Sequence, residues 1–313
     1  TLYQDSSGQT KHIPVQLFFD DAKTNIKESY FLKNENDSVK EGPYRAYFDS
    51  GKLFKEGTFL NGLIEGEWKT FNEDGSKNEI LHYKDGEKNG KFEIYYPNGQ
   101  VYQSGFFREN NYHDSLKIFN ESGNLIEWRS YKNGKLHGKS IGFNENKIMT
   151  FRRDYNEGSA WGAWELFYDN GIISEEAHYI NNVFHGPFIS YHKNGNANLV
   201  CQYENGKLTG EFRSHNALGA LLLKCTYIND SIDGLWEEFY DNTYPGLENV
   251  KQVREKGSYS HGKRIGNWIV YHPKGEKKIE GLYKDGAYSG VWNAFYPNGK
   301  LKQTGKYIKG KAE

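Results

Sequence analysis

The stretch Gly90-Lys-Phe-Glu-Ile-Tyr-Tyr-Pro-Asn-Gly99 decides the fold, because its pattern returns every 24 residues along the chain. A later copy reads Gly290-Val-Trp-Asn-Ala-Phe-Tyr-Pro-Asn-Gly299. The copies start at positions 42, 66, 90, 114, 138, 162, 186, 210, 234, 266 and 290. All of these positions are glycine except Asp114, and an eight-residue insertion lengthens the step from 234 to 266. The chain therefore contains eleven repeats, and we count offsets from the first residue of each.

Aromatic side chains fill three fixed columns of this repeat. Offset 17 is aromatic in all eleven repeats, and offset 5 is aromatic in all but one, which has His215. Offset 2 is aromatic except at Leu116 and Ser140. Offset 15 is Gly, Ala or Cys in eight repeats. Columns that stay in register over eleven copies indicate one structural element that is stacked on itself.

Glycine recurs at offsets 9 and 20 as well. The substitutes are Asn110, Asn182 and Asp230 at offset 20, and we assign Asn146 to offset 9. Asn and Asp are the non-glycine residues that best tolerate a positive φ. These columns therefore predict left-handed backbone rather than a need for small side chains.

Each repeat is predicted to form one β-hairpin, because Asn-Gly separates two aromatic-rich runs. With offsets 8 and 9 as the central pair of the turn, offset 2 faces offset 15 and offset 6 faces offset 11. The ring at offset 2 is then expected to cover the small residue across the hairpin. Alternation places offsets 2, 6, 11, 15 and 17 on one face, and offset 5 on the other face unless a bulge intervenes.

The fold class that follows is all-β: an elongated solenoid of about eleven stacked antiparallel hairpins, preceded by a cap hairpin. Residues 1–41 are predicted to be a tail and an irregular cap hairpin, with strands at Val15–Phe19 and Lys27–Leu32. Residues 42–313 are predicted to be the solenoid. One hairpin of this size is not stable alone, so stability must come from contacts between neighbouring repeats.

The quoted repeats, each followed by a tyrosine and by Asn/Asp-Gly-x-x-x-Gly, resemble bacterial MORN-repeat variants over residues 42–310. The resemblance implies a β-hairpin solenoid, and relatives include scaffolds and exported or envelope proteins. A long, aromatic-rich and charge-balanced ribbon with no reactive constellation predicts a non-enzymatic scaffold that binds another protein, in an exported or cell-envelope assembly. An antitoxin or immunity protein that neutralises a toxin is the alternative, which leaves a cytoplasmic location open. Lipid binding is a more distant alternative. The family supplies no catalytic motif.

Composition excludes several other classes of function. The chain has 40 Lys and Arg against 41 Asp and Glu, so it lacks the basic excess that nucleic acids or anionic membranes attract. No apolar stretch approaches the length of a transmembrane helix. Gly138-Lys-Ser-Ile-Gly142 matches a nucleophile elbow only because it falls on the columns of the repeat. We expect no enzyme activity, no catalytic residue, no cofactor and no metal site.

Cys201 and Cys225 both lie at offset 15, one repeat apart. Equivalent positions in successive hairpins are two strands apart, roughly 9–10 Å. A disulfide needs Cα atoms within about 7 Å. The two cysteines are therefore predicted to be free, small core residues.

The fourth and fifth repeats break the pattern, which makes them the candidate partner site. Arg129 and Arg153 replace the small residue at offset 15, with Arg152 beside them and Trp128 and Trp161 nearby. These side chains could hold an acidic segment of a partner protein. Alternatively, the arginine stems fill the space that the missing rings leave.

The insertion Asp241–Gln252 is a second candidate for partner contact, and Tyr244 is its aromatic residue. Insertions in repeat proteins often decorate a binding face. They are equally often tolerated surface loops.

Small-angle scattering tests the predicted elongated shape. Eleven two-stranded repeats at the usual strand spacing give a maximum dimension on the order of 100 Å. A compact value, as for a sphere of 313 residues, would contradict the solenoid.

Overall fold

A computed structural model describes residues 12–34, 38–243, 246 and 251–313. These residues form 26 β-strands and no helix, which confirms the predicted all-β fold of consecutive hairpins. In chain order the strands are β1 (Ile13–Phe18), β2 (Ile26–Leu32), β3 (Gly42–Tyr47), β4 (Leu53–Leu60), β5 (Leu63–Phe71), β6 (Lys77–Lys84), β7 (Glu87–Tyr95), β8 (Val101–Arg108), β9 (Asn111–Phe119), β10 (Leu125–Lys132), β11 (Lys135–Phe143), β12 (Met149–Asn156), β13 (Ser159–Phe167), β14 (Ile173–Ile180), β15 (Val183–Phe184), β16 (Gly186–Tyr191), β17 (Ala197–Glu204), β18 (Lys207–His215), β19 (Leu221–Ile228), β20 (Ser231–Phe239), β21 (Val253–Ser260), β22 (Lys263–Tyr271), β23 (Lys277–Lys284), β24 (Ala287–Phe295), β25 (Leu301–Ile308) and β26 (Lys311–Ala312).

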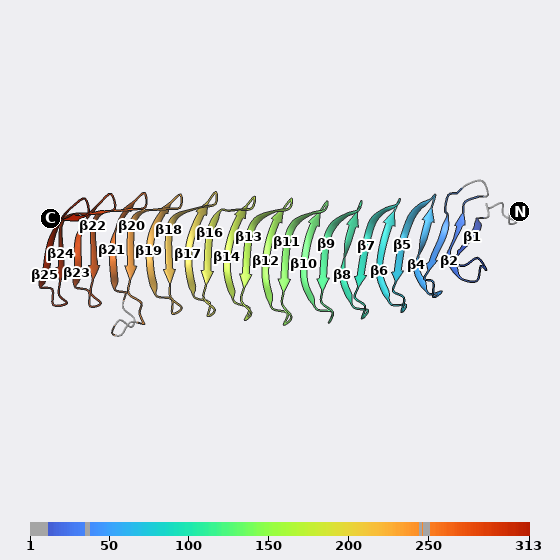
Figure 1. Ribbon diagram of the computed structural model, residues 1–313, viewed down its shortest axis with the longest axis horizontal. Helices are drawn as coiled ribbons and strands as arrows, with labels where there is room; N and C mark the ends of the chain where they lie inside the picture. Colours follow the sequence, from blue (N-terminus) through green and yellow to red (C-terminus); the bar gives the residue numbers. More distant parts are fainter. Residues whose placement is uncertain (1–11, 35–37, 244–245, 247–250) are drawn as a thin grey trace. The chain divides into compact units, whose positions relative to one another are not determined.

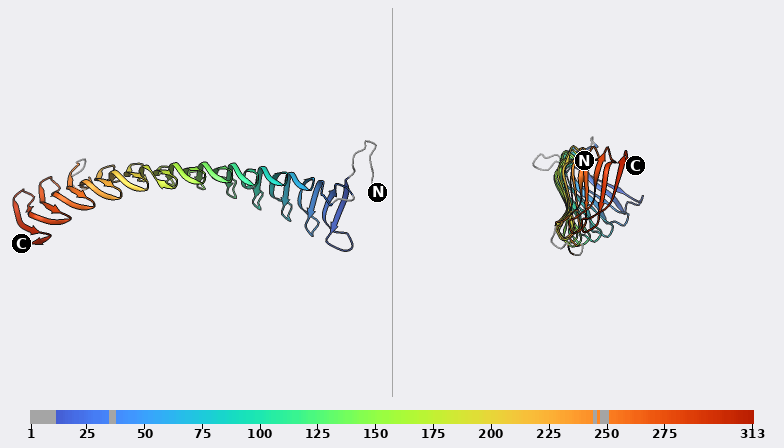
Figure 2. Two further views of the ribbon diagram at one scale, coloured as in Figure 1. Left: turned by 90° about the horizontal axis from the view of Figure 1, so that it is seen from above. Right: turned by 90° about the vertical axis from the view of Figure 1, so that its left-hand side faces the viewer.

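The chain divides into two compact units, which are described separately. The first unit comprises Thr1–Met149 and Tyr155–Gly158, and the second comprises Thr150–Asp154 and Ser159–Glu313. In the first unit each strand from β1 to β11 pairs antiparallel with the next. In the second unit the same order holds from β13 to β26, and β14 pairs with both β15 and β16. Within each unit the hairpin turns lie along one edge and the links between hairpins along the other (Figures 1 and 2).

The predicted register holds for the part of each hairpin that is remote from its turn. Offset 2 faces offset 15, as Phe92 faces Gly105. The expectation that offset 6 faces offset 11 is wrong, because the register shifts after offset 4. Offset 5 faces offset 11 instead, as Tyr95 faces Val101. The residue at offset 12 is therefore the extra residue of a β-bulge.

The bulge also decides where the offset-5 rings lie. It interrupts only the second strand of the hairpin, so alternation along the first strand puts offset 5 on the face opposite offset 2. The hydroxyl of Tyr95 accordingly donates to Glu93, and that of Tyr191 donates to Glu176. We call the face with offsets 2, 15, 17 and 22 the aromatic face, and the face with offsets 1, 3, 5, 14 and 16 the polar face.

The hairpin turn is a three-residue loop rather than the predicted two-residue one. The N–H of Gly99 donates to the carbonyl of Tyr96 (2.9 Å), whose own N–H donates to the carbonyl of Gln100 (2.8 Å). Within this loop only Gly99 has a positive φ, 84°, as in a type I turn followed by one left-handed residue. Two-residue turns occur between the hairpins instead, where Asp85 and Gly86 both have positive φ, 51° and 86°.

Non-glycine residues in the glycine columns adopt the predicted left-handed backbone. φ is 59° at Asp114, 65° at Asn110, 67° at Asn182 and 69° at Asp230. The side-chain oxygen of Asn110 also accepts the N–H of Lys88 (2.9 Å), and the other two offset-20 substitutes make the equivalent bond. These side chains therefore tolerate the backbone conformation and also join neighbouring hairpins.

The fifth repeat corrects the assignment at offset 9. Lys147 has the positive φ, 62°, and Asn146 precedes it, so the assignment of Asn146 to this column is wrong by one residue. The side chain of Asn144 accepts the N–H groups of Asn146 and Ile148, both at 3.0 Å. These bonds hold the loop closed around a lysine in a left-handed position.

Rings on the aromatic face join neighbouring hairpins. Trp68 lies on Gly57 of the preceding hairpin, so closely that a Cβ at position 57 would be 2.2 Å from the indole. Trp268 and Gly257 repeat this contact. The indole N–H of Trp68 donates to the carbonyl of Thr58 (3.2 Å). The expected cover of a glycine by a ring is present, but these tryptophans cover the glycine of the hairpin before them.

Burial in the first unit centres on the same face. Leu81, Phe92 and Leu116 are at most 6% exposed and form one hydrophobic cluster. Phe92 keeps the expected arrangement within its own hairpin, because a Cβ on Gly105 would lie 2.9 Å from its ring. The core is thus a row of side chains along one face of the strands.

The cap hairpin is confirmed as β1 and β2, whose pairing begins at Ile13 and Leu32. β2 also pairs with β3, which joins the cap to the first repeat. The amine of Lys40 lies 4.4 Å from the centre of the Tyr30 ring and 4.8 Å from that of Tyr44. The division of the sequence into residues 1–41 and 42–313 stays a prediction.

Gly57→Ala tests the contact between ring and glycine. The added methyl must displace an indole that is only 3% exposed, so we expect the free energy of unfolding to fall by about 1–3 kcal/mol. Gly305→Ala is the matched control, because it occupies the same offset with no tryptophan against it. Chemical denaturation of the two variants gives the comparison. Equal effects would contradict the packing account.

Candidate functional site

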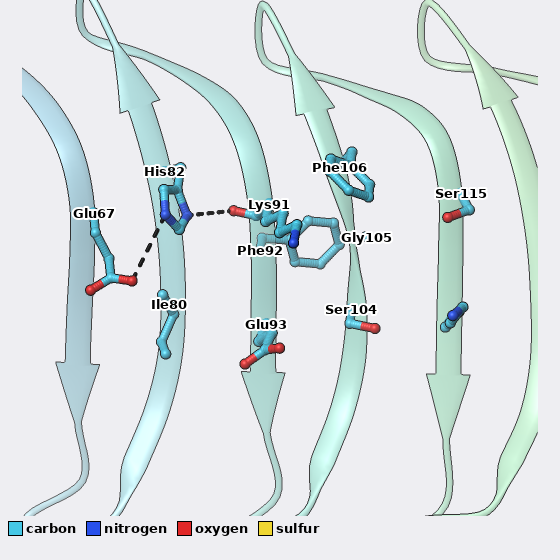
Figure 3. Close-up of a pocket in the computed structure, with 11 residues that line it drawn as sticks. Glu67, Ile80, His82, Lys91, Phe92, Glu93, Ser104, Gly105, Phe106 and Ser115 are labelled. Carbon is cyan, nitrogen blue, oxygen red and sulfur yellow. Dashed lines mark hydrogen bonds and ion pairs between the residues drawn. The ribbon is translucent and has the colours of Figure 1, made fainter.

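The polar face of the first unit carries a hollow of about 460 Å³ over strands β5 to β9 (Figure 3). This volume lies within the range of about 300–1,000 Å³ that ligand pockets occupy. Offsets 1, 3, 14 and 16 of successive repeats supply most of its wall. The side chains of interest in that wall are Ile80, Lys91, Ser104, Phe106, Ser115 and Lys117. The hollow forms because small residues at Ser104, Gly105 and Ser115 lie among longer side chains.

One acidic group of the wall, Glu67, is held by its neighbours. Its carboxylate is 2.7 Å from the amine of Lys69 and 3.8 Å from Nε2 of His82. The hydrogen bond from Lys69 lowers the pKa of Glu67 below its usual value. Nδ1 of His82 donates to the carbonyl of Lys91 (2.9 Å), which orients the ring toward Glu67 (Figure 3). The charge of Glu67 is therefore already compensated.

The second acidic group, Glu93, accepts a hydrogen bond from the hydroxyl of Tyr95. Burial, together with this hydrogen bond, raises the pKa of Tyr95. The phenol thus remains a donor across the ordinary pH range and keeps Glu93 occupied.

The amines of the two lysines in the wall, unlike the carboxylates of the two glutamates, have no side-chain partner among the described residues. Lys91 and Lys117 make no ion pair within the part of the chain that the structure describes. Ser104 faces Lys117 across β8 and β9, and Phe106 faces Lys91 across β7 and β8. The hydroxyls of Ser104 and Ser115 likewise have no hydrogen bond to another described residue. The hollow therefore contains two ammonium groups and two hydroxyls that have no ion pair or hydrogen bond to another described residue, and one aromatic ring.

Trp128, one of the predicted partner-binding residues, lies on β10, the strand next to this hollow, and is not one of the residues that line it. It lies at offset 14, hence on the polar face, and is partly exposed. It faces Lys117 on one side and Ile141 on the other.

Arg129, the residue after it, points to the aromatic face. It faces Leu116 and Ser140 in the two neighbouring strands, and both of these are 3% exposed. Its guanidinium makes two hydrogen bonds to the carboxylate of Glu127, at 2.7 and 2.8 Å. This geometry agrees with the alternative in which an arginine stem fills space between smaller side chains.

The second unit contains Arg152 and Arg153. Arg152 lies 2.5 Å from the carboxylate of Glu165, a hydrogen bond that raises the pKa of the guanidinium. Arg153 lies over the rings of Phe151 (4.4 Å) and Trp164 (4.8 Å), and its Nε is buried with no partner among the described residues. Arg153 thus takes the place against a tryptophan that glycine holds elsewhere.

Of the remaining predicted residues, Trp161 is 40% exposed on β13, and Tyr244 lies outside the described residues. The structure places Trp128 beside the hollow and packs Arg129 and Arg153 on the aromatic face of their units. A role for any of the six in partner binding stays a prediction.

Sequence reasoning missed Lys91, Lys117 and Phe106. The signal was available, since the confirmed part of the register pairs offset 1 with 16 and offset 3 with 14. Grouping these columns would have placed the missed residues together on the face opposite the ring columns.

Reactive chemistry is sparse elsewhere. Residues 12–34, 38–243, 246 and 251–313 contain no group of three His, Cys, Asp or Glu side chains arranged to hold a metal ion. Cys201 and Cys225 are free and buried, and burial raises the pKa of both thiols to about 11. None of the described residues forms a helix with the length and apolar character needed to span a membrane.

The two cysteines provide a direct test of this burial. At pH 8 a thiol with a pKa of about 11 is only about 0.1% thiolate, and both sulfurs are shielded from solvent. We expect Ellman's reagent to label neither cysteine in the native protein and to label both in guanidinium. Rapid labelling of either thiol without denaturant would contradict the packing of the aromatic face in the second unit.

Several solved structures match the chain with low similarity. The crystal structure of TcdB2-TccC3-Cdc42 has 10% identity and a TM-score of 0.19, and the match covers 98% of this chain and 18% of that one. The crystal structure of TcdB2-TccC3 has 9% identity and a TM-score of 0.20, with 98% and 19% covered. The Photorhabdus luminescens Tc holotoxin pore has 11% identity and a TM-score of 0.18, with 96% and 18% covered. The chain spans about a fifth of the length of these proteins, and TM-scores this low carry no argument. No curated protein matches the sequence.

A family model described as MORN repeat variant matches six segments, at residues 40–61, 64–85, 88–109, 162–181, 264–285 and 288–309. The matches keep the 24-residue register of the glycine columns. The repeats that start at 114, 138, 186, 210 and 234 fall outside them. These six segments of the chain are therefore MORN repeat variants.

Proposed function

We propose that the protein is a non-enzymatic scaffold that binds another protein on its polar face. The two faces contribute differently to the packing between hairpins. On the aromatic face, rings pack on the glycines and rings of neighbouring hairpins, so their surface is already used. The polar face is left for a partner.

The hollow beside Trp128 is the observation that carries the proposal. It is a cavity lined by two lysines and two serines whose polar groups bind no other described side chain, together with an aromatic ring. Tryptophan is among the residue types enriched in the energetic centres of protein interfaces. A surface of this composition fits a protein better than it fits a substrate, since neither serine of the wall is hydrogen-bonded to an activating base among the described residues and no metal cluster lies there.

Specificity follows from irregularity in the repeats. Identical repeats offer identical surfaces, which cannot fix one register for a partner. The hollow differs from the equivalent positions of other repeats, because Ser104 at offset 14 stands where every other repeat has a larger side chain. The partner's identity would distinguish an envelope or secreted assembly from an antitoxin-type complex.

Capture of a partner by the purified full chain tests this function. We expect one defined protein from native cell extract to bind, and Phe106→Ala with Trp128→Ala to reduce its capture at least thirtyfold, the equivalent of about 2 kcal/mol at a true hot spot. Phe54→Ala is the matched control, because Phe54 is also an exposed ring, 40% accessible, but lies near a hairpin turn. Thermal unfolding should be nearly unchanged in both variants.

Loss of capture in the control, or equal capture by the wild type and the double variant, would contradict a binding site on the polar face.

A further inference from the structure

We propose that the hollow of the polar face binds an acidic segment of the partner protein in extended conformation. Two carboxylates of the segment pair with Lys91 and Lys117, and an apolar side chain between or beside them lies on Phe106. This inference rests on the proposed function, because it names the chemistry of the partner at the same site.

The first argument is the charge left over after folding. Several basic groups on the polar face of the second unit have acidic partners, as in the pair of Lys224 and Glu211 (3.0 Å) and that of Arg152 and Glu165 (2.5 Å). Lys91 and Lys117 are both exposed, both line one hollow, and neither has such a partner among the described residues. Two free ammonium groups around one cavity are complementary to a pair of anions.

The second argument is spacing. Lys91 is on β7 and Lys117 on β9, so their strands are two strand spacings apart, roughly 9–10 Å. The two lysines are also displaced by two residues along the strands, because Ser104 pairs with both Glu93 and Lys117, so their Cα atoms are roughly 12 Å apart. Side chains two residues apart in an extended peptide point the same way and are separated by about 7 Å. The flexible four-carbon stem of lysine covers the difference. A peptide that crosses the strands can therefore present acids at positions i and i+2 to both amines.

The third argument is the rest of the wall. Ser104 and Ser115 lie near the two lysines and supply hydroxyl donors that carboxylates accept. Ile80 and the half-buried ring of Phe106 supply the apolar surface for a neighbouring side chain.

Glu67 and Glu93 in the wall of the hollow limit how much negative charge a ligand can carry. Glu67 and Glu93 flank the lysines, so a long uniform polyanion would meet repulsion where a short acidic segment would not. A nucleic acid or an anionic membrane surface is disfavoured for the same reason. The wall therefore selects two acids within a segment of mixed character.

Selection from a random twelve-residue peptide library on the full chain tests the inference. We expect peptides enriched on the wild type to carry two acidic residues near an aromatic or aliphatic one. Lys91→Gln with Lys117→Gln should weaken their binding at least tenfold, and Lys91→Arg with Lys117→Arg should restore most of it. Lys224→Gln, which removes a paired lysine from the same face, is the matched control and should change nothing.

Three outcomes would overturn the inference. Enriched peptides would lack acidic residues, or would bind the glutamine double variant as well as the wild type. Alternatively, millimolar inorganic phosphate would bind alone and displace the peptides completely, which would assign the hollow to a free anion.

The same variants separate this inference from the proposed function. If the native partner is lost on Phe106→Ala with Trp128→Ala but is retained by the glutamine double variant, the scaffold function stands and the acidic segment is wrong. If both double variants lose it, both proposals are supported.

Discussion

The structure depends on left-handed backbone at fixed positions in every repeat. A residue with a Cβ loses about 1–2 kcal/mol in that conformation, so glycine, Asn or Asp is favoured there, with exceptions such as Lys147. Gly99 closes the hairpin turn, Asp85 and Gly86 turn the chain into the next hairpin, and Gly90 has a φ of 118° at the start of the following repeat. With these positions fixed, the strands have one register. The rings of offset 2 then fall on the glycines of offset 15.

How far the sequence predicts this fold depends on which residues carry a signature. The left-handed columns were visible because Asn110, Asn182 and Asp230 replace glycine, a pattern that has a conformational meaning. The bulge at offset 12 was not visible, since that column contains no repeated residue type. Asn-Gly also occurs in both kinds of turn, so the dipeptide alone could not assign the two-residue turn to the right edge. The assignment of Asn146 was an error of counting, since offset 9 of the repeat that starts at Gly138 is Lys147.

The candidate site was harder to predict than the fold for a related reason. Folding constrains the aromatic face, so its residues repeat and stand out as columns. The polar face is free to vary, and its lysines and serines stand out only when the register places them side by side. Trp128 was singled out because it lies outside the aromatic columns, and its role in binding stays a prediction, whereas Arg129 faces Leu116 and Arg153 lies over the ring of Trp164. A departure from the repeat on the aromatic face is thus explained by packing between hairpins. A departure on the polar face is a candidate for a binding surface.

The central claim concerns backbone conformation, and Gly99 allows it to be tested without a steric contribution. φ at Gly99 is 84°, and a Cβ added there would meet nothing within 4 Å. The direct measurement is the free energy of unfolding of two semisynthetic proteins with L-alanine or D-alanine at this position. The account predicts that L-alanine destabilises by about 1–2 kcal/mol, because its side chain opposes positive φ, while D-alanine is neutral or stabilising by up to about 1 kcal/mol. Equal stability of the two proteins would contradict the claim that left-handed backbone determines the register of the repeats.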